Sequence, residues 1–107
     1  MTLCHPPLTG AEIAIIGQGV IDESRRADLM ERLEVLRRIA ADEPGTLAWQ
    51  WYCDLKDPSV LCVYELYSDR EALDLHREHV LHLLPGVGEC FSTPIAPRRV
   101  RPMASRA

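Results

Sequence analysis

Three histidines follow one another at a spacing of three residues, at His76, His79 and His82 in the segment HREHVLH. An imidazole can bind a metal ion, exchange a proton near neutral pH, or face solvent without a part in any chemistry. The apolar periodicity of residues 69–84 predicts a helix here. Which role applies therefore depends on the face of that helix that each ring occupies.

A helical wheel separates the three rings. His76 falls in the middle of the apolar arc that Leu73 and Val80 define. His79 lies at the border of that arc, and His82 lies on the charged side. Because His76 and His82 are about 9 Å apart along the axis and point about 120° apart, they cannot share one metal ion. We therefore expect no metal site and a solvated His82. His76 is either a core histidine with its hydrogen bonds satisfied or an imidazole that exchanges protons in a cavity.

Three segments around this helix are rich in β-branched or aromatic residues, as strands are, and a fourth can form a short strand that Pro97 confines to an edge or a bulge. In the second of them, alternation places Leu47, Trp49, Trp51 and Cys53 on one face. Gly17 and Gly19 within the first indicate a bulge or the close approach of another backbone. The four predicted strands are 11–21, 46–55, 60–68 and 93–103.

Two segments have the periodicity of amphipathic helices. The first helix is expected to end at Pro44 and Gly45. The second is expected to begin at a capping box formed by Ser68 and Glu71. We expect it to stop at the PGVG segment, residues 85–88.

The resulting order, β-α-β-β-α-β, predicts an α+β, ferredoxin-like fold with two helices on one face of a four-stranded antiparallel sheet. Within 107 residues, nothing is left to cover the other face. A second copy of the chain is the simplest cover, and we therefore expect a homodimer. The predicted domain spans residues 11–101, between a flexible lead-in at 1–10 and a tail at 102–107.

The composition is typical of one globular domain, with 47% hydrophobic and 26% charged residues. A formal net charge of -4 argues against nucleic acid as the partner. No run approaches the roughly 20 apolar residues of a membrane span, and the opening residues lack the pattern of a signal peptide. We therefore expect a cytoplasmic protein without a membrane partner. The four cysteines form no CxxC pair, and we expect reduced, mostly buried thiols.

Residues 43–79 combine several spaced features: EPG after the first helix, an aromatic hairpin strand, a D-x-x-D-P turn, YE-x-Y-x-D-REAL, and the histidine that follows. In these features the chain resembles the antibiotic biosynthesis monooxygenase family of small dimeric α/β-barrel proteins. The resemblance implies a ferredoxin-like protomer, a homodimer whose sheets form a barrel, and a cavity between sheet and helices. Oxygenases of this type resemble one another in needing neither metal nor flavin, so the resemblance implies no cofactor.

Carried over position by position, the resemblance makes His76 the family's helix histidine and Glu65 its acidic strand residue. Tyr67 stands where relatives often have a tryptophan that faces the cavity. These three are the expected catalytic residues. Trp49 and Trp51 are either aromatic walls for a planar ligand or core packing. Glu65 has an alternative role in an ion pair across the hairpin or the dimer.

The chain departs from the family in two respects. Haem-degrading relatives and some polyketide oxygenases use a cavity asparagine, and this chain contains none, which argues against haem degradation. Gln18, on the first strand, is the nearest polar amide and a candidate substrate-binding residue whose facing the sequence leaves open. The spacing after the helix histidine is also shortened, so His79 is a second candidate for the cavity histidine and for substrate binding.

The resemblance implies a cofactor-independent monooxygenase that oxidises a small phenolic, quinol or anthrone-like aromatic with molecular oxygen, in polyketide or other secondary-metabolite biosynthesis. Such an enzyme must bind a flat ring, remove a proton, and hold the anion near oxygen in a dry site. A cofactor-free isomerase or cyclase would use the same cavity without oxygen. The third alternative is a non-catalytic dimeric binding module, which a cavity filled by Trp49 and Trp51 would favour.

Overall fold

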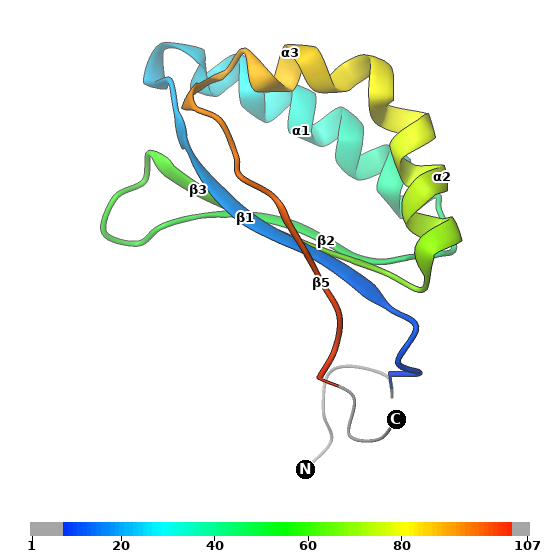
Figure 1. Ribbon diagram of the computed structural model, residues 1–107. Helices are drawn as coiled ribbons and strands as arrows, with labels where there is room; N and C mark the ends of the chain where they lie inside the picture. Colours follow the sequence, from blue (N-terminus) through cyan, green and yellow to red (C-terminus); the bar gives the residue numbers. More distant parts are fainter. Residues whose placement is uncertain (1–7, 104–107) are drawn as a thin grey trace.

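The computed structural model describes residues 8–103, so most of the predicted lead-in and tail lie outside the described residues. The chain has the predicted α+β, ferredoxin-like architecture: helices pack on one face of a single antiparallel sheet (Figure 1). The helices are α1 (Arg26–Ala41), α2 (Arg70–Val80) and α3 (Leu84–Gly88), with 3-10 turns at Glu23–Arg25 and Leu81–Leu83. The strands are β1 (Ile13–Ile21), β2 (Thr46–Cys53), β3 (Val60–Tyr67), β4 (Phe91–Thr93) and β5 (Arg98–Val100).

Strand β1 lies at the centre of the sheet. It pairs with β3 on one side and with both β4 and β5 on the other, and β2 completes the sheet beyond β3. The register places Trp49 opposite Glu65, Glu65 opposite Ile15, and Ile15 opposite Arg99. These four residues therefore form a row across the sheet, on the face that the helices cover. We call it the cross-sheet row.

The last strand differs from the predicted 93–103, because this part of the chain forms two short strands, β4 at Phe91–Thr93 and β5 at Arg98–Val100, instead of one. Pro94 and Pro97 lie between β4 and β5, and a proline has no backbone N–H to donate to a sheet. The segment between the strands crosses over β1 at its two glycines. A Cβ added at Gly17 would lie 2.6 Å from the Ala96 carbonyl oxygen, and one at Gly19 would meet backbone at 2.8 Å. The predicted close approach of another backbone is confirmed.

The second helix does not stop at the PGVG segment, so that prediction is wrong. The chain passes from α2 through a 3-10 turn into α3, where Pro85 occupies the first turn. A proline is tolerated there because the first N–H groups of a helix have no intrahelical partner. The start of α2 also differs in detail. Asp69 is the N-cap, and its carboxylate accepts a hydrogen bond from the Ala72 N–H at 2.8 Å.

Strand β2 contains an irregularity that the alternating pattern did not predict. The register with β3 shifts between Thr46 and Ala48, which leaves Leu47 with 45% of its surface exposed. The prediction that Leu47 shares a face with the two tryptophans is therefore wrong. Trp49 and Trp51 keep the common face and both pack against the core.

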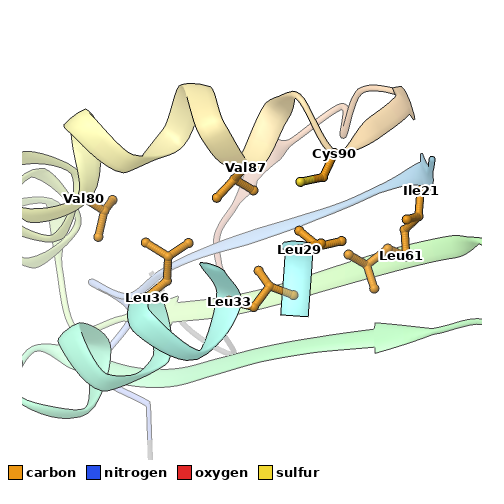
Figure 2. Packing of buried hydrophobic residues seen from close by; sticks show 8 residues of the cluster. All are labelled: Ile21, Leu29, Leu33, Leu36, Leu61, Val80, Val87 and Cys90. Carbon is orange, nitrogen blue, oxygen red and sulfur yellow. The ribbon is translucent and has the colours of Figure 1, made fainter. Parts of the chain in front are cut away.

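The core lies between the helices and the sheet (Figure 2). Leu29, Leu33 and Leu36 of α1 are all buried, as the leucine stripe predicts. Full burial of each such side chain contributes about 1.5–3 kcal/mol. The core cluster consists of Ile21, Leu29, Leu33, Leu36, Leu61, Val80, Val87 and Cys90.

The other face of the sheet carries no covering element among residues 8–103 (Figure 1). Ile16 and Tyr52 are 38% and 53% exposed there, and Gln18 and Cys62 lie between them in the register. Helices with the length and apolar character of a membrane span do not occur in the described part of the chain.

Candidate active site

A cavity of about 400 Å³ lies between the helix-covered face of the sheet and the α2–α3 segment. The cross-sheet row, from Trp49 to Arg99, forms part of one wall, and His76 lies in the opposite one. Sites for small organic ligands have volumes of about 300–1,000 Å³ and apolar walls with a few polar groups. Most residues that line this cavity are apolar, so it has the size and character of such a site.

A buried carboxylate that sequence reasoning missed holds two of the three histidines. The Oε1 atom of Glu43 lies 2.6 Å from His76 Nδ1, and Oε2 lies 2.6 Å from His79 Nδ1. The Thr46 hydroxyl donates a third hydrogen bond to Oε1 at 2.8 Å. Burial alone would raise the pKa of Glu43, but the hydrogen bonds from His79, His76 and Thr46 outweigh it and hold the pKa below its ordinary value. Glu43 is therefore an ionised acceptor.

This arrangement fixes which nitrogen of His76 is free. An ionised carboxylate only accepts hydrogen bonds, so the Nδ1 atom of His76 must carry the proton that it donates to Glu43. The Nε2 atom makes no hydrogen bond to any of residues 8–103, and the buried ring lines the cavity. A neutral His76 therefore presents a lone pair at Nε2, as a general base requires.

The position of Glu43 follows from the turn that joins α1 to β2. A Cβ added at Gly45 would lie 2.5 Å from the Ala72 Cβ, and the Ser68 N–H donates to the Gly45 carbonyl at 2.9 Å. The turn thus packs against the start of α2, where a larger residue would not fit. The EPG segment was interpreted only as a helix end and a mark of resemblance, and it is the signal that could have identified Glu43.

Glu65 and Tyr67 form a second polar pair in the cavity. The Tyr67 hydroxyl donates to Glu65 Oε1 at 2.5 Å, and the Tyr67 ring lies 5.3 Å from the His76 ring between centroids. Burial raises the pKa of Glu65 despite the opposing effects of the hydrogen bond from Tyr67 and of the nearby His76 imidazole. Burial, followed by the charge of Glu65, also raises the pKa of Tyr67. The structure thus brings His76, Glu65 and Tyr67 together.

Trp49 and Trp51 both line the cavity and pack against the core. Their ring centroids are 5.6 Å apart with an interplanar angle of 31°, and Phe91 meets Trp51 edge-on at 6.4 Å. The two indole N–H groups are buried and have no hydrogen-bond partner among the described residues. The space beside them stays open, so these tryptophans wall the cavity without filling it.

The remaining candidates lie outside the cavity. His79 contacts Glu43, but its side chain is 44% exposed and does not line the cavity. Gln18 lies on the open face of the sheet, where its side chain approaches Cys62 Sγ at 3.9 Å, and is exposed. His82 is exposed, as the helical wheel predicts.

The cysteines and histidines do not assemble a metal centre in the described part of the chain. Residues 8–103 contain no group of three His, Cys, Asp or Glu side chains arranged to hold a metal ion. The Nδ1 atoms of His76 and His79 each hydrogen-bond directly to the Glu43 carboxylate at 2.6 Å. Cys90 is buried, whereas Cys53 is exposed and Cys62 is half-buried, and all three are free thiols. The prediction of mostly buried thiols therefore holds for Cys90 alone among them, and Cys4 lies outside the described residues.

The raised pKa of Glu65 leads to a stability prediction. A carboxyl group whose folded pKa is raised stabilises the fold at low pH, and this contribution is lost as the pH rises through the folded value. Glu65→Gln keeps an acceptor for Tyr67 without ionising. We expect the variant and the wild type to have similar melting temperatures near pH 4, and the variant to become the more stable as the pH rises. The gain is about 1.4 kcal/mol for each unit by which the pKa is raised. A difference that does not change with pH would contradict this.

Comparison with known proteins agrees with this architecture. The sequence profile described as "Antibiotic biosynthesis monooxygenase" matches residues 13–83. A conserved protein from Methanosarcina mazei superposes with a TM-score of 0.80 at 20% identity, over 86% of this chain and 93% of the other. Rv0793 from Mycobacterium tuberculosis superposes with a TM-score of 0.78 at 26% identity, over 90% of this chain and 99% of the other.

A third solved structure, from Nitrosomonas europaea, is named as a candidate antibiotic biosynthesis monooxygenase. It superposes with a TM-score of 0.78 at 17% identity, over 95% of this chain and all of the other (100%). None of the curated proteins matches this chain. The family profile covers most of the helices, strands and polar groups described above. On that coverage, the chain belongs to the antibiotic biosynthesis monooxygenase family.

Proposed function

We propose that the protein is a cofactor-independent monooxygenase that oxidises a phenolic, quinol or anthrone-like aromatic. The observation that carries the proposal is the ring of His76, which Glu43 holds through Nδ1 at 2.6 Å beside a cavity walled by Trp49 and Trp51. A base with a fixed orientation next to an aromatic binding surface suits the removal of a proton from an electron-rich ring. Family membership supports the same reaction class.

The proposed reaction needs no electrons beyond those of the substrate. With an anthrone, His76 Nε2 takes a proton from the ring methylene, and the resulting anion transfers electrons to molecular oxygen. A carbon–oxygen bond forms, and the resulting peroxide anion takes the proton held on His76 to give a hydroperoxide. His76 then removes the second hydrogen of the same carbon as a proton, the oxygen–oxygen bond breaks, and the departing hydroxide takes that proton and leaves as water, so that a carbonyl remains. The balance is one CH₂ group and one O₂ converted to one C=O group and one water.

Glu65 and Tyr67 have a supporting part in this proposal. The raised pKa of Glu65 favours its protonated form, and a protonated carboxyl group can donate a hydrogen bond to an oxygen anion. Tyr67 lies within 2.5 Å of that carboxyl group through its hydroxyl. The pair is therefore suited to stabilising charge on the substrate oxygen while the ring reacts.

The test is oxygen consumption with a matched pair of substrates, anthrone and 1,4-dihydroxynaphthalene, by protein treated with a chelator. We expect oxygen uptake above the spontaneous rate, with one atom of ¹⁸O₂ in the anthraquinone product. Deuterium exchange at the ring methylene without oxygen uptake would favour the isomerase or cyclase alternative, because only proton transfer would then occur. Saturable binding with neither reaction would favour the binding module.

We also propose that the functional unit is a homodimer. The open face of the sheet exposes apolar side chains including Ile16 and Tyr52, and a two-fold contact through this face would bury them. Sedimentation at micromolar concentration should show a dimer, and a stable monomer would contradict the proposal.

The expected compartment is the cytoplasm, and the exposed free thiol of Cys53 suits a reducing environment.

A further inference from the structure

Two arginines line the cavity without a partner of their own. Arg77 comes from α2 and Arg99 from β5. Among residues 8–103, neither guanidinium forms an ion pair or a side-chain hydrogen bond. By contrast, every arginine of α1 and of the 3-10 turn before it forms an ion pair with a carboxylate. These arginines are Arg25, Arg26, Arg32, Arg37 and Arg38. Arg77 and Arg99 are exposed residues that line the cavity, and guanidinium groups without a protein partner are suited to binding an anion.

The carboxylates in and beside the cavity hydrogen-bond to other residues and do not pair with these arginines. Glu43 is bonded to His76, His79 and Thr46. Glu65 is bonded to Tyr67, and burial favours its neutral form. Both guanidinium groups are therefore free to pair with an anionic ligand beside the apolar walls of the cavity.

The cross-sheet row sets the distance between the aromatic and the cationic ends. Trp49 and Arg99 are separated by three strand spacings, which amounts to roughly 14 Å between their backbones. Both residues line the cavity. A fused bicyclic or tricyclic ring that stacks near Trp49 can therefore present one substituent to Arg99.

Arg77 brings positive charge to the same space from the helix. It follows His76 directly in the sequence. Its positive charge lowers the pKa of the Tyr67 hydroxyl, whereas burial raises it. An anionic substituent held by Arg77 and Arg99 would thus fix the ring relative to His76. A neutral quinol would leave both guanidinium groups without a partner.

We propose that the substrate is an aromatic carboxylate, with its flat ring against Trp49 and Trp51 and its carboxylate bound by Arg77 and Arg99. The inference rests on the proposed function insofar as the ligand is an electron-rich aromatic. It adds that the substrate has a permanent negative charge, which serves to orient the ring and to select acids over neutral quinols.

Equilibrium binding of two closely matched ligands tests this directly. 1,4-Dihydroxy-2-naphthoate and its carboxamide are measured anaerobically, near pH 6, by calorimetry, so that no turnover occurs and only the acid is charged. We expect the wild type to bind the acid about 10- to 100-fold more tightly, as charge-assisted hydrogen bonds allow. The preference should shrink at high salt. Equal affinity for the two ligands in the wild type would overturn the proposal without any variant.

The double variant Arg77→Gln/Arg99→Gln assigns the preference to these residues. It should bind the acid and the carboxamide equally, with the affinity for the carboxamide unchanged. Arg98→Gln is the matched control, because Arg98 lies next to Arg99 in β5 and pairs with Ile16, so it faces the open side of the sheet. Retention of the preference in the double variant would overturn the assignment.

If the carboxamide and the acid both bind but neither is oxidised, the proposed function fails and the anion site stands. If neither binds, both proposals fail.

Discussion

Replacement of His76 by asparagine should lower turnover by about 10²–10⁴-fold, the usual contribution of a positioned general base. The asparagine amide takes the place of Nδ1 and still donates to Glu43, but it has no basic nitrogen to correspond to Nε2. The affinity for the aromatic ligand should change little, because Trp49 and Trp51 are retained. Turnover and anaerobic binding, measured side by side, give the two quantities.

Two further variants define what this result means. His76→Phe removes the base and also the donor to Glu43, so it should lose turnover and about 1–3 kcal/mol of stability as well. His82→Phe changes a histidine on the exposed side of the same segment and should alter neither turnover nor binding. Full turnover in His76→Asn would reduce His76 to a core residue and leave Glu65 and Tyr67 as the candidates for proton transfer.

Replacement of Glu43 by glutamine should lower turnover by about 10- to 100-fold without contact between Glu43 and the substrate. The carboxylate accepts from both Nδ1 atoms, whereas an amide can accept from one ring and must donate to the other. One histidine is then forced into the opposite tautomer. Where that histidine is His76, its Nε2 carries a proton and no longer acts as a base.

A structural role alone would give a different result. Glu43→Ala should lose both turnover and stability, the latter by about 1–3 kcal/mol, because two imidazoles lose their hydrogen-bond acceptor. Glu43→Gln should instead keep most of its stability while the pH dependence of turnover changes. Glu31→Gln, at an exposed position of α1, is the control for loss of one negative charge. An unchanged pH profile in Glu43→Gln would show that the carboxylate does not orient the base.

Short-range patterns predicted most of the fold, because each helix and strand has its own apolar periodicity. The leucines of α1 are buried as their spacing predicts, and β2 and β3 pair as the predicted hairpin. The predictions were wrong at two places where a sequence rule has an exception. Pro85 was interpreted as a stop although it can begin a new helix, and nothing in the alternation around Leu47 revealed the register shift in β2.

The candidate site could be predicted only in part, since half of it depends on contacts between distant segments. The helical wheel placed His76 on the buried face, and the structure puts its ring there with 5% exposure. Glu43 lies 33 residues earlier, and no periodicity connects a turn residue with a helix face. The side of the sheet that Gln18 faces was equally undetermined, because both neighbours of Gln18 are glycines and carry no apolar pattern.

The central place of β1 has a consequence for how the chain folds. The first strand in the sequence pairs with β3 and then with β4 and β5, so its partners are synthesised after it, the last of them near residue 100. Pairings between such distant segments slow folding, because a long loop must close before any contact forms. During translation β1 stays an unpaired apolar strand until β3 emerges. Its other edge stays unpaired until β4 and β5 have been synthesised. Because β5 contributes Arg99 to the cavity, a nascent chain cannot complete the binding site before the end of the domain has emerged.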